Sequence, residues 1–141
     1  MSDSSTHTPP PFRPHLRFVA VLLWCSGGFW ASSRPDLRIS PDDQLDFILR
    51  KAAHMGEFAV LVLLTAWALS GIGRTWRAAT VGAWVFTLAW ACSDEWHQTF
   101  VRGRVGHPSD VLIDMTGATI ALAATGAVRR FRTTRPLEAA P

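Results

Sequence analysis

The sequence predicts an all-α fold: an integral membrane four-helix bundle with both termini cytoplasmic. The first reason is composition, because 48% of the 141 residues are hydrophobic and only 18% are charged, whereas charged residues make up about a quarter of a soluble domain. The second reason is distribution, because the charged residues are bunched between four long apolar runs. A chain of this length supplies one domain and no second core.

Each apolar run approaches the length of a membrane crossing. A helix of about 20 residues, rising about 1.5 Å per residue, spans a hydrocarbon core about 30 Å thick. The first and third runs are short for a full crossing, and the helix of the third can continue through Gln98. Trp residues fall mostly near the ends of the runs, where indoles favour the membrane interface. The runs are residues 16–33, 52–71, 78–93 and the stretch that follows Pro108 and ends at Val128.

These runs divide the chain into three parts. Residues 1–15 are rich in Ser, Thr and Pro, so we expect a disordered N-terminal tail. Residues 16–128 form the four-helix transmembrane domain. Residues 129–141 begin with Arg129 and Arg130 and form a basic cytoplasmic tail. The predicted location is therefore the cell membrane, with multiple crossings.

Two alternatives compete with this prediction. A soluble bundle of buried helices needs polar helix faces, and the second and fourth runs have almost none. The first run has a basic flank and ends in the small residues Ala31, Ser32 and Ser33, which also suits a cleaved signal peptide. We favour a retained membrane helix.

The basic residues predict the orientation of the bundle. With four crossings, both termini lie on one side, together with the loop between the second and third helices. That side holds eight basic residues against six on the other, and the positive-inside rule places the richer side in the cytoplasm. The eight are Arg13, Arg17, Arg74, Arg77, Arg129, Arg130, Arg132 and Arg135.

Polar residues gather at the opposite, outer end of the predicted helices. They come from the start of the second helix, the end of the third, the loop that follows and the start of the fourth. An ionisable group at membrane depth costs several kcal/mol unless it is paired or wetted, so we expect these side chains to face one another. They are Lys51, His54, Glu57, Asp94, Glu95, His97, Gln98, Arg102, Arg104, Asp110 and Asp114.

Glu57 and Asp114 lie deepest in this cluster and have the greatest need of partners. A spacing of three places His54 and Glu57 on one helix face, and a spacing of four does the same for Asp110 and Asp114. Carboxylates near the start of the fourth helix also gain about 0.3–1 kcal/mol each from the helix dipole. The partners expected for the two deep carboxylates are His54, Lys51, Arg102 and Arg104.

Two stretches of the sequence resemble the motifs of a known family. Residues 50–58 read RKAAHMGEF and look like the opening motif of the VanZ-like family, named for a teicoplanin-resistance protein. Residues 94–118 read DEWHQTFVRGRVGHPSDVLIDMTGA and resemble its second motif: an acidic pair, Gln, an aromatic residue, a Gly-Arg loop, then Asp and Gly on the last helix. The resemblance covers residues 16–128, nearly the whole predicted bundle.

Most of the polar cluster matches this pattern, and two positions depart from it. Arg102 replaces the proline that usually precedes the Gly-Arg of the loop, and Asp114 stands where the family commonly has Asn. An acid at the second position raises the local negative charge. The residues that match are Lys51, His54, Glu57, Asp94, Glu95, Gln98, Arg104, Asp110 and Gly117.

The resemblance implies a membrane protein connected with glycopeptide antibiotic susceptibility and the cell envelope, and it implies no settled reaction. The partners it suggests are membrane lipids, lipid-linked cell-wall precursors and glycopeptides. Nucleic acid is not among the expected partners, because the sequence has no basic patch interleaved with aromatic residues. The oligomeric state is left open.

The function that we favour for the polar cluster is binding of a lipid or envelope-precursor headgroup. Arg102 and Arg104 would grip a phosphate, while carboxylates and amides would accept from hydroxyl, amine or peptide groups. The headgroup-binding candidates are Lys51, Gln98, Arg102, Arg104, Asp110 and Asp114.

Two other functions compete with it. The protein could be an intramembrane hydrolase or transferase acting on a lipid-linked substrate, with side chains suited to acid–base work or to a divalent metal. No HExxH motif is present, so no metal is assigned and no cofactor is required. Alternatively, the polar residues only cap helices and anchor them at the interface, and the protein is a structural membrane anchor. The catalytic candidates are His54, Glu57, Asp94, Glu95 and His97.

Overall fold

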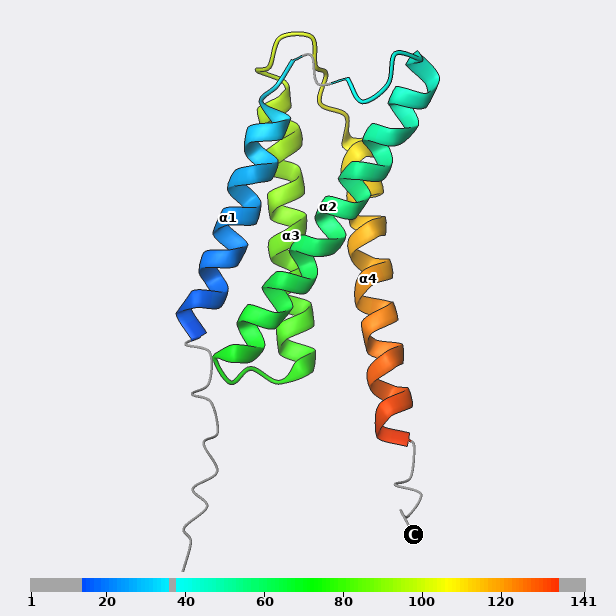
Figure 1. The fold of residues 1–141 in the computed structure, drawn as a ribbon. Helices are drawn as coiled ribbons and strands as arrows, with labels where there is room; N and C mark the ends of the chain where they lie inside the picture. Colours follow the sequence, from blue (N-terminus) through cyan, green and yellow to red (C-terminus); the bar gives the residue numbers. More distant parts are fainter. Residues whose placement is uncertain (1–13, 36–37, 135–141) are drawn as a thin grey trace, which may run out of the picture.

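The computed structural model describes residues 14–35 and 38–134. Over these residues the chain forms four α-helices and no strands, which confirms the all-α prediction (Figure 1). Most of the predicted N-terminal tail, residues 1–13, and the end of the predicted C-terminal tail, residues 135–141, lie outside the described residues. The helices are α1 (Pro14–Ser32), α2 (Asp43–Gly71), α3 (Trp76–Gln98) and α4 (Pro108–Thr134).

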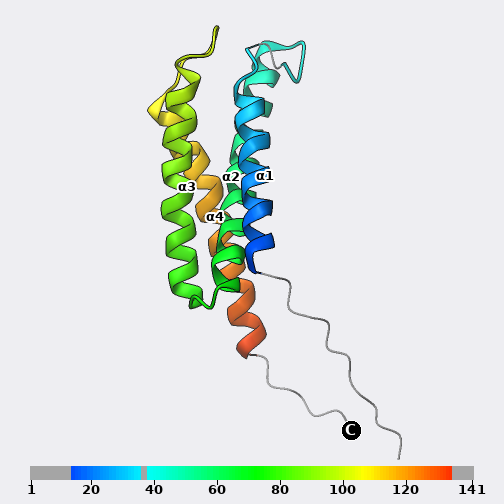
Figure 2. The same cartoon turned by 90° about the vertical axis from the view of Figure 1, so that its left-hand side faces the viewer.

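The central helix of the bundle is α2. It contacts α1, α3 and α4, whereas α1 and α4 do not contact each other. The end of α1, the start of α2, the end of α3 and the start of α4 lie at one end of the bundle, the upper end in Figure 1 and Figure 2. The short turn between α2 and α3 lies at the other end, together with the start of α1 and the end of α4. Successive helices therefore run in opposite directions.

The start of α2 precedes the apolar run that predicted the helix, because polar residues cap it. Asp42 is the N-cap and accepts a hydrogen bond from the backbone N–H three residues further on, at 2.8 Å. The buried Asp46 accepts from the N–H groups of Ile39 at 2.7 Å and Ser40 at 3.2 Å. It also pairs with Arg50 at 2.9 Å. Arg50 and Lys51, which precede the second apolar run, thus lie inside the helix.

The bounds of α3 and α4 also follow from residues outside the apolar runs. Helix α3 starts at Trp76 and continues through Gln98, as predicted. Helix α4 starts at Pro108, a first position that suits proline because its missing N–H would be unpaired there anyway. It continues past Val128, where the apolar run ends, and Arg129 lies over the ring of Trp76 at 4.3 Å.

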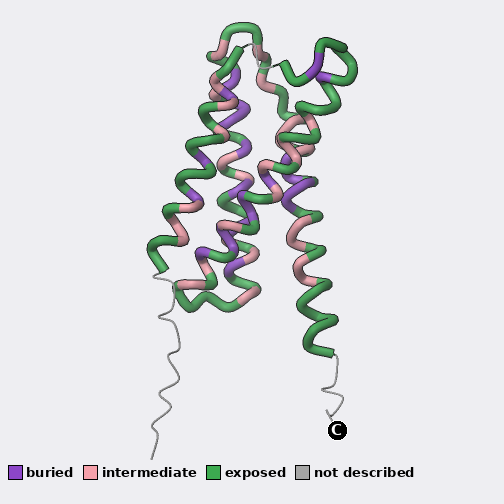
Figure 3. Tube along the Cα trace, viewed as in Figure 1, coloured by how far each residue is buried: buried purple, intermediate pink, exposed green. Residues whose placement is uncertain are grey.

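Small buried residues bring the helices close together. Ala66, Ala83 and Ala118 lie in one core cluster with Val62 and Met115. Small residues let helix backbones approach closely, as they do between membrane helices. Figure 3 shows the buried residues along the interior of the bundle and exposed residues on its outer faces. A second cluster joins α1, α2 and α3 through Val21, Cys25, Phe58, Leu61, Ala68 and Ala91.

The outer faces of the helices are apolar. Leu22 is 65% exposed and Leu112 is 70% exposed. Helices α2 and α4 are long and apolar enough to cross a membrane, and only 33% and 22% of their apolar stretches are buried, whereas the core helix of a soluble protein is mostly buried. In the described part of the chain, α1 and α3 do not meet the same criteria. Length and composition therefore support two of the four predicted crossings.

Gly117 tests the close contact between α2 and α4. A Cβ at this position would meet the backbone of Met55, which has no rotamer that could relieve the contact. We expect Gly117→Ala to lower the free energy of unfolding by about 1–3 kcal/mol, as overpacking does, and to lower the midpoint of thermal unfolding in detergent. Gly126→Ala is the control, because nothing lies within 4 Å of a Cβ there. Equal midpoints for the two variants would contradict this packing.

Candidate functional site

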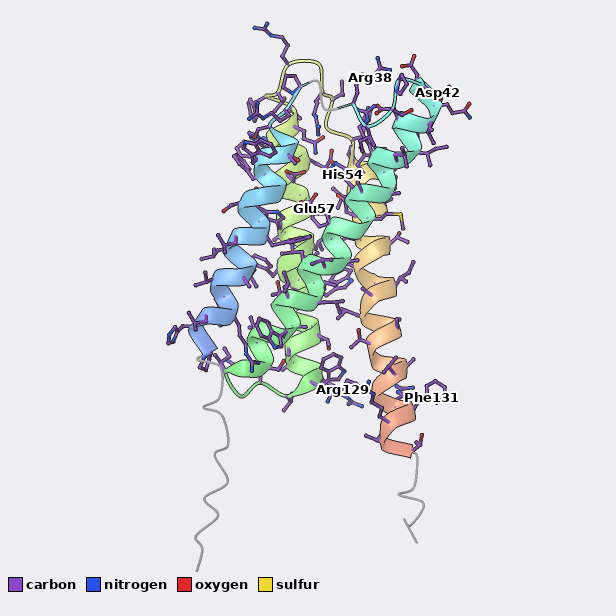
Figure 4. All side chains as sticks on the ribbon, in the orientation of Figure 1. Arg38, Asp42, His54, Glu57, Arg129 and Phe131 are labelled. Carbon is purple, nitrogen blue, oxygen red and sulfur yellow. The ribbon has the colours of Figure 1, made fainter. Side chains whose placement is uncertain are left out.

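The polar cluster predicted from the sequence lies at the upper end of the bundle in Figure 1, which we call the polar end. Figure 4 shows His54 and Glu57 in the half of α2 nearer to this end. Arg129 and Phe131 mark the opposite end of the molecule in the same view. Side chains from all four helices and from the loop between α3 and α4 contribute to the polar end.

A buried carboxylate joins α1 to α3. Asp94 is buried, and its Oδ2 accepts hydrogen bonds from the hydroxyl of Ser32 at 2.7 Å and from the amide of Gln98 at 2.9 Å. The Gln98 amide also donates to the Ser32 hydroxyl at 3.4 Å. Asp94 and Gln98 were predicted members of the cluster, whereas Ser32 was not. These bonds compensate the cost of burying the Asp94 charge.

A second buried carboxylate folds the α3–α4 loop back onto the end of α3. Glu95 is buried, and its Oε2 accepts from the backbone N–H of His107 at 3.0 Å. Gly106 passes so close to α3 that a Cβ there would meet the backbone of Glu95. Gly103 has a φ of +77°, a conformation that glycine adopts at no steric cost. The folded loop carries Arg104 inward.

Two polar contacts join α2 to α4. Lys51 forms an ion pair with Asp110. One turn deeper, Nδ1 of His54 lies 3.8 Å from Oδ1 of Asp114, within ion-pair range but too long for a hydrogen bond. The Asp114 side chain is 1% exposed, and neither carboxylate oxygen has a hydrogen-bond partner among the described residues. His54 was among the basic partners predicted for Asp114, and the contact is an ion pair only when the imidazole is protonated.

Two adjoining polar pockets open beside these contacts. The larger has a volume of 190 Å³ and the smaller 80 Å³, and both are lined by Arg50, His54 and Arg104. Arg50 is paired with Asp46, but Arg104 has no carboxylate within ion-pair distance among the described residues. Its Nε is buried and has no hydrogen-bond partner in the same part of the chain. The pockets therefore contain a guanidinium group with unused donors.

Glu57 does not reach the basic partners predicted for it. Its half-buried carboxylate makes no hydrogen bond or ion pair with another described residue and instead lies against the backbone of Gly28 on α1. A spacing of three falls short of a 3.6-residue turn by about 60°. The faces of Lys51, His54 and Glu57 therefore rotate progressively from α4 towards α1. Glu57 lines the smaller polar pocket and also an apolar pocket of 540 Å³ between α1 and α2.

A comparison with protein-family models identifies the family of the chain. The model described as VanZ/LLP1 matches residues 10–129. The chain belongs to the VanZ/LLP1 family. This confirms the resemblance found in the sequence, and the matched residues include the whole polar cluster. A search of curated proteins and a search of solved structures found no match.

Five predicted site residues line none of the pockets of this VanZ/LLP1-family protein: Asp94, Glu95, His97, Arg102 and Asp114. Arg102, which replaces the proline of the VanZ-like loop motif, is exposed and lines neither polar pocket. That Arg102 grips a ligand together with Arg104 stays a prediction; of the two side chains, Arg104 lines the pockets. His97 contacts the Ser33 hydroxyl at 3.1 Å and the Phe29 ring at 4.3 Å between centroids, so it serves the α1–α3 contact.

Sequence reasoning overlooked two residues of the VanZ-like site. Arg50 lines both polar pockets, although it was not among the residues predicted for the cluster. Ser32 was treated as the small-residue end of the first run, although a hydroxyl near the acidic end of another helix is a signal for a buried hydrogen bond. Among the described residues, no three His, Cys, Asp or Glu side chains lie close enough together to hold a metal ion.

Removing the hydrogen bond between Ser32 and Asp94 tests whether this bond stabilises the contact between α1 and α3. We expect Ser32→Ala to lower the free energy of unfolding by about 1–3 kcal/mol, because it leaves a buried carboxylate short of one donor. The midpoint of thermal unfolding in detergent measures this loss. Ser26→Ala is the control, because among the described residues the Ser26 hydroxyl donates only to the carbonyl of Leu22 on its own helix. A loss no larger than in the control would refute the role of Ser32.

Proposed function

We propose that this VanZ/LLP1-family protein crosses the cell membrane four times and binds the anionic headgroup of a lipid at its outer face. The observation that carries the proposal is the unpartnered guanidinium of Arg104 in a pocket that Arg50, Lys51 and His54 also line. A phosphate is the ligand for which such a group is best suited, because guanidinium and phosphate form paired, charge-assisted hydrogen bonds.

Aromatic and basic residues at both ends of the bundle support the four crossings. Arg17 lies over the ring of Trp67 at 4.7 Å near the start of α1, and Arg34 lies over Trp30 at 4.6 Å just beyond its end. Trp and Arg side chains of this kind favour the two membrane interfaces. The 19 residues of α1 and the 23 residues of α3 have the length of a crossing at about 1.5 Å per residue. The excess of basic residues at the other end from the site supports cytoplasmic termini.

The pocket suits a small headgroup. Its volume of 190 Å³ is below the roughly 300–1,000 Å³ of pockets that enclose a whole drug-sized ligand. Lys51 is already neutralised by Asp110, which leaves Arg104 to attract the anion. Gln98 lines the same pocket and provides an amide for a hydroxyl or amine of the headgroup.

Membrane phospholipids and lipid-linked precursors of the cell envelope share this phosphate chemistry. A VanZ-like protein that holds such a precursor by its headgroup would change how readily a glycopeptide reaches it. This provides a physical route from the site to the antibiotic susceptibility that the family resemblance implies.

A second candidate function rests on His54 and Asp114. A histidine with one ring nitrogen facing a buried carboxylate, beside a pocket for phosphate, has the groups needed for acid–base catalysis. In that case the protein is a hydrolase or transferase of a lipid-linked phosphate. Mass spectrometry of the lipid recovered from the binding experiment below separates the two functions, because only the enzyme yields a product.

Arg104→Gln is the test of headgroup binding. We expect the purified protein in nanodiscs to bind phosphatidylglycerol in preference to phosphatidylcholine, measured by native mass spectrometry. Loss of one paired guanidinium–phosphate contact should weaken this preference by about tenfold or more, since each charge-assisted hydrogen bond contributes about 1.5–3 kcal/mol.

Arg102→Gln is the matched control, because it removes the same charge two residues away from an exposed position. It should leave the preference unchanged. If both variants lose it equally, the attraction is a general surface effect, and the proposed site is wrong.

Cysteine labelling tests the topology. In a protein with Cys25 and Cys92 replaced by Ala, a membrane-impermeant maleimide should label Val105→Cys in intact cells and Ile72→Cys only after lysis. Both positions are exposed, at 70% and 49%, and they lie in the two loops at opposite ends of the bundle. Labelling of both cysteines from the same side would rule out four crossings. Labelling of Ile72→Cys in intact cells and of Val105→Cys only after lysis would show that the bundle has the opposite orientation in the membrane.

A further inference from the structure

We propose that the apolar pocket between α1 and α2 holds a hydrocarbon chain of the same lipid whose headgroup lies beside Arg104. This inference rests on the proposed headgroup site and extends it, because it assigns a second, separate part of the ligand. The ligand class is an anionic amphiphile with at least one long acyl or prenyl chain, taken from the outer leaflet.

Small residues create the groove. Gly27, Gly28 and Ala31 line it from α1, and Gly56 and Val60 line it from α2. Between them they leave 540 Å³ of space, the largest volume of the three pockets described here. The lining is apolar apart from Glu57 and the indole of Trp24, so the groove suits a hydrocarbon chain and offers no site for a phosphate.

Helices α1 and α2 are held in place along this groove by polar contacts on its wall. The indole N–H of Trp24 donates to the backbone carbonyl of Glu57 at 3.0 Å. The Glu57 carboxylate lies against Gly28, where any side chain would displace it. The groove is therefore a fixed feature of the α1–α2 contact.

The groove and the headgroup pocket are each linked to a third pocket by shared lining residues. The 80 Å³ pocket lies between them: it shares Ala31, Ala53 and Glu57 with the groove. It shares Arg50, His54 and Arg104 with the 190 Å³ pocket. Three spaces thus follow one another from basic, through mixed, to apolar, which is the order of phosphate, linker and chain in a phospholipid.

Glu57 stands at the transition from polar to apolar. Its carboxylate makes no hydrogen bond with another described residue, and Glu57 lines both the groove and the 80 Å³ pocket, where the linker of the lipid would lie. It is available to accept from a hydroxyl or amide group there. This gives a role to the deep carboxylate on α2 that does not reach its predicted basic partners.

The groove extends over most of the thickness of one leaflet. From Ala31 to Leu23 on α1, and from Ala53 to Val60 on α2, the lining extends about 10–12 Å along the helix axes. Half of a hydrocarbon core is about 15 Å thick. Because bulk lipid is as apolar as the groove, the chain gains little from leaving the bilayer. Occupancy by a particular lipid should therefore depend on the headgroup contact with Arg104.

Photo-crosslinking in nanodiscs tests this inference. The probe is phosphatidylglycerol with a diazirine in the middle of one acyl chain, in a phosphatidylcholine bilayer, and the crosslinked peptides are identified by mass spectrometry. We expect crosslinks concentrated on residues 23–31 and 53–60, and loss of these crosslinks when unlabelled phosphatidylglycerol is added. A phosphatidylcholine probe of the same chain length should crosslink there much less.

Filling the groove provides the matched variants. Gly27→Leu and Gly56→Leu each place a side chain in open space within the groove, and Gly126→Leu places one in open space elsewhere. Either groove variant should lower the groove crosslinks by about fivefold or more, because a filled cavity resists a further chain as overpacking does. Gly126→Leu should not. Unchanged thermal midpoints will confirm that the variants fold.

The outcomes separate this inference from the proposed headgroup site. If Arg104→Gln weakens headgroup preference while the groove crosslinks persist undiminished, or if both probes crosslink the groove equally, bulk lipid fills the groove and the inference is wrong. If Arg104→Gln changes neither headgroup preference nor crosslinking, the headgroup site itself is wrong. The headgroup site and the groove inference are both supported if Arg104→Gln loses the headgroup preference and the groove crosslinks, while Gly27→Leu loses only the groove crosslinks.

Discussion

The structure depends on how ionisable groups are compensated where four apolar helices meet. Burying a charge is costly unless it is paired or hydrogen-bonded, and most charges at the polar end meet this condition. Asp94 is bonded to Ser32 and Gln98, and Lys51 is paired with Asp110. These contacts join α1 to α3 and α2 to α4. The groups left uncompensated are therefore informative. The donors of Arg104 and the carboxylate of Glu57 face pockets, and the carboxylate of Asp114 is buried beside His54 without a hydrogen bond to another described residue.

Most of the fold could be predicted because one physical signal dominates the sequence. Four apolar runs separated by clustered charges predicted four helices, and the described residues form four helices. The ends of the helices were predicted less well where polar or aromatic contacts, and not the apolar run, determine where a helix begins or ends. Asp42 and Asp46 start α2 in a polar stretch that has no apolar periodicity, and Arg129 continues α4 by packing on Trp76. A hydropathy pattern contains neither kind of contact.

The sequence predicted which residues gather at the candidate site, but it predicted less well which of them contact one another. Spacing placed His54 and Glu57 on one helix face, yet a shortfall of about 60° per three residues turns one towards α4 and the other towards α1. Similarly, Arg102 and Arg104 are equivalent in sequence, but the positive φ of Gly103 and the bond from His107 to Glu95 orient the loop so that Arg104 alone reaches the pocket. Such differences depend on tertiary contacts, which no single motif specifies.

The central claim is that Arg104 binds a lipid phosphate, and a distance between the two groups tests it most directly. Solid-state NMR of the protein in phosphatidylglycerol bilayers, with ¹⁵N-labelled arginine, measures the dipolar coupling between guanidinium nitrogen and lipid phosphorus. The account predicts a coupling that corresponds to about 4 Å, the separation set by a direct hydrogen bond, and its disappearance in Arg104→Gln. A coupling that survives this substitution unchanged would show that the phosphates lie only beside surface arginines and would contradict the account.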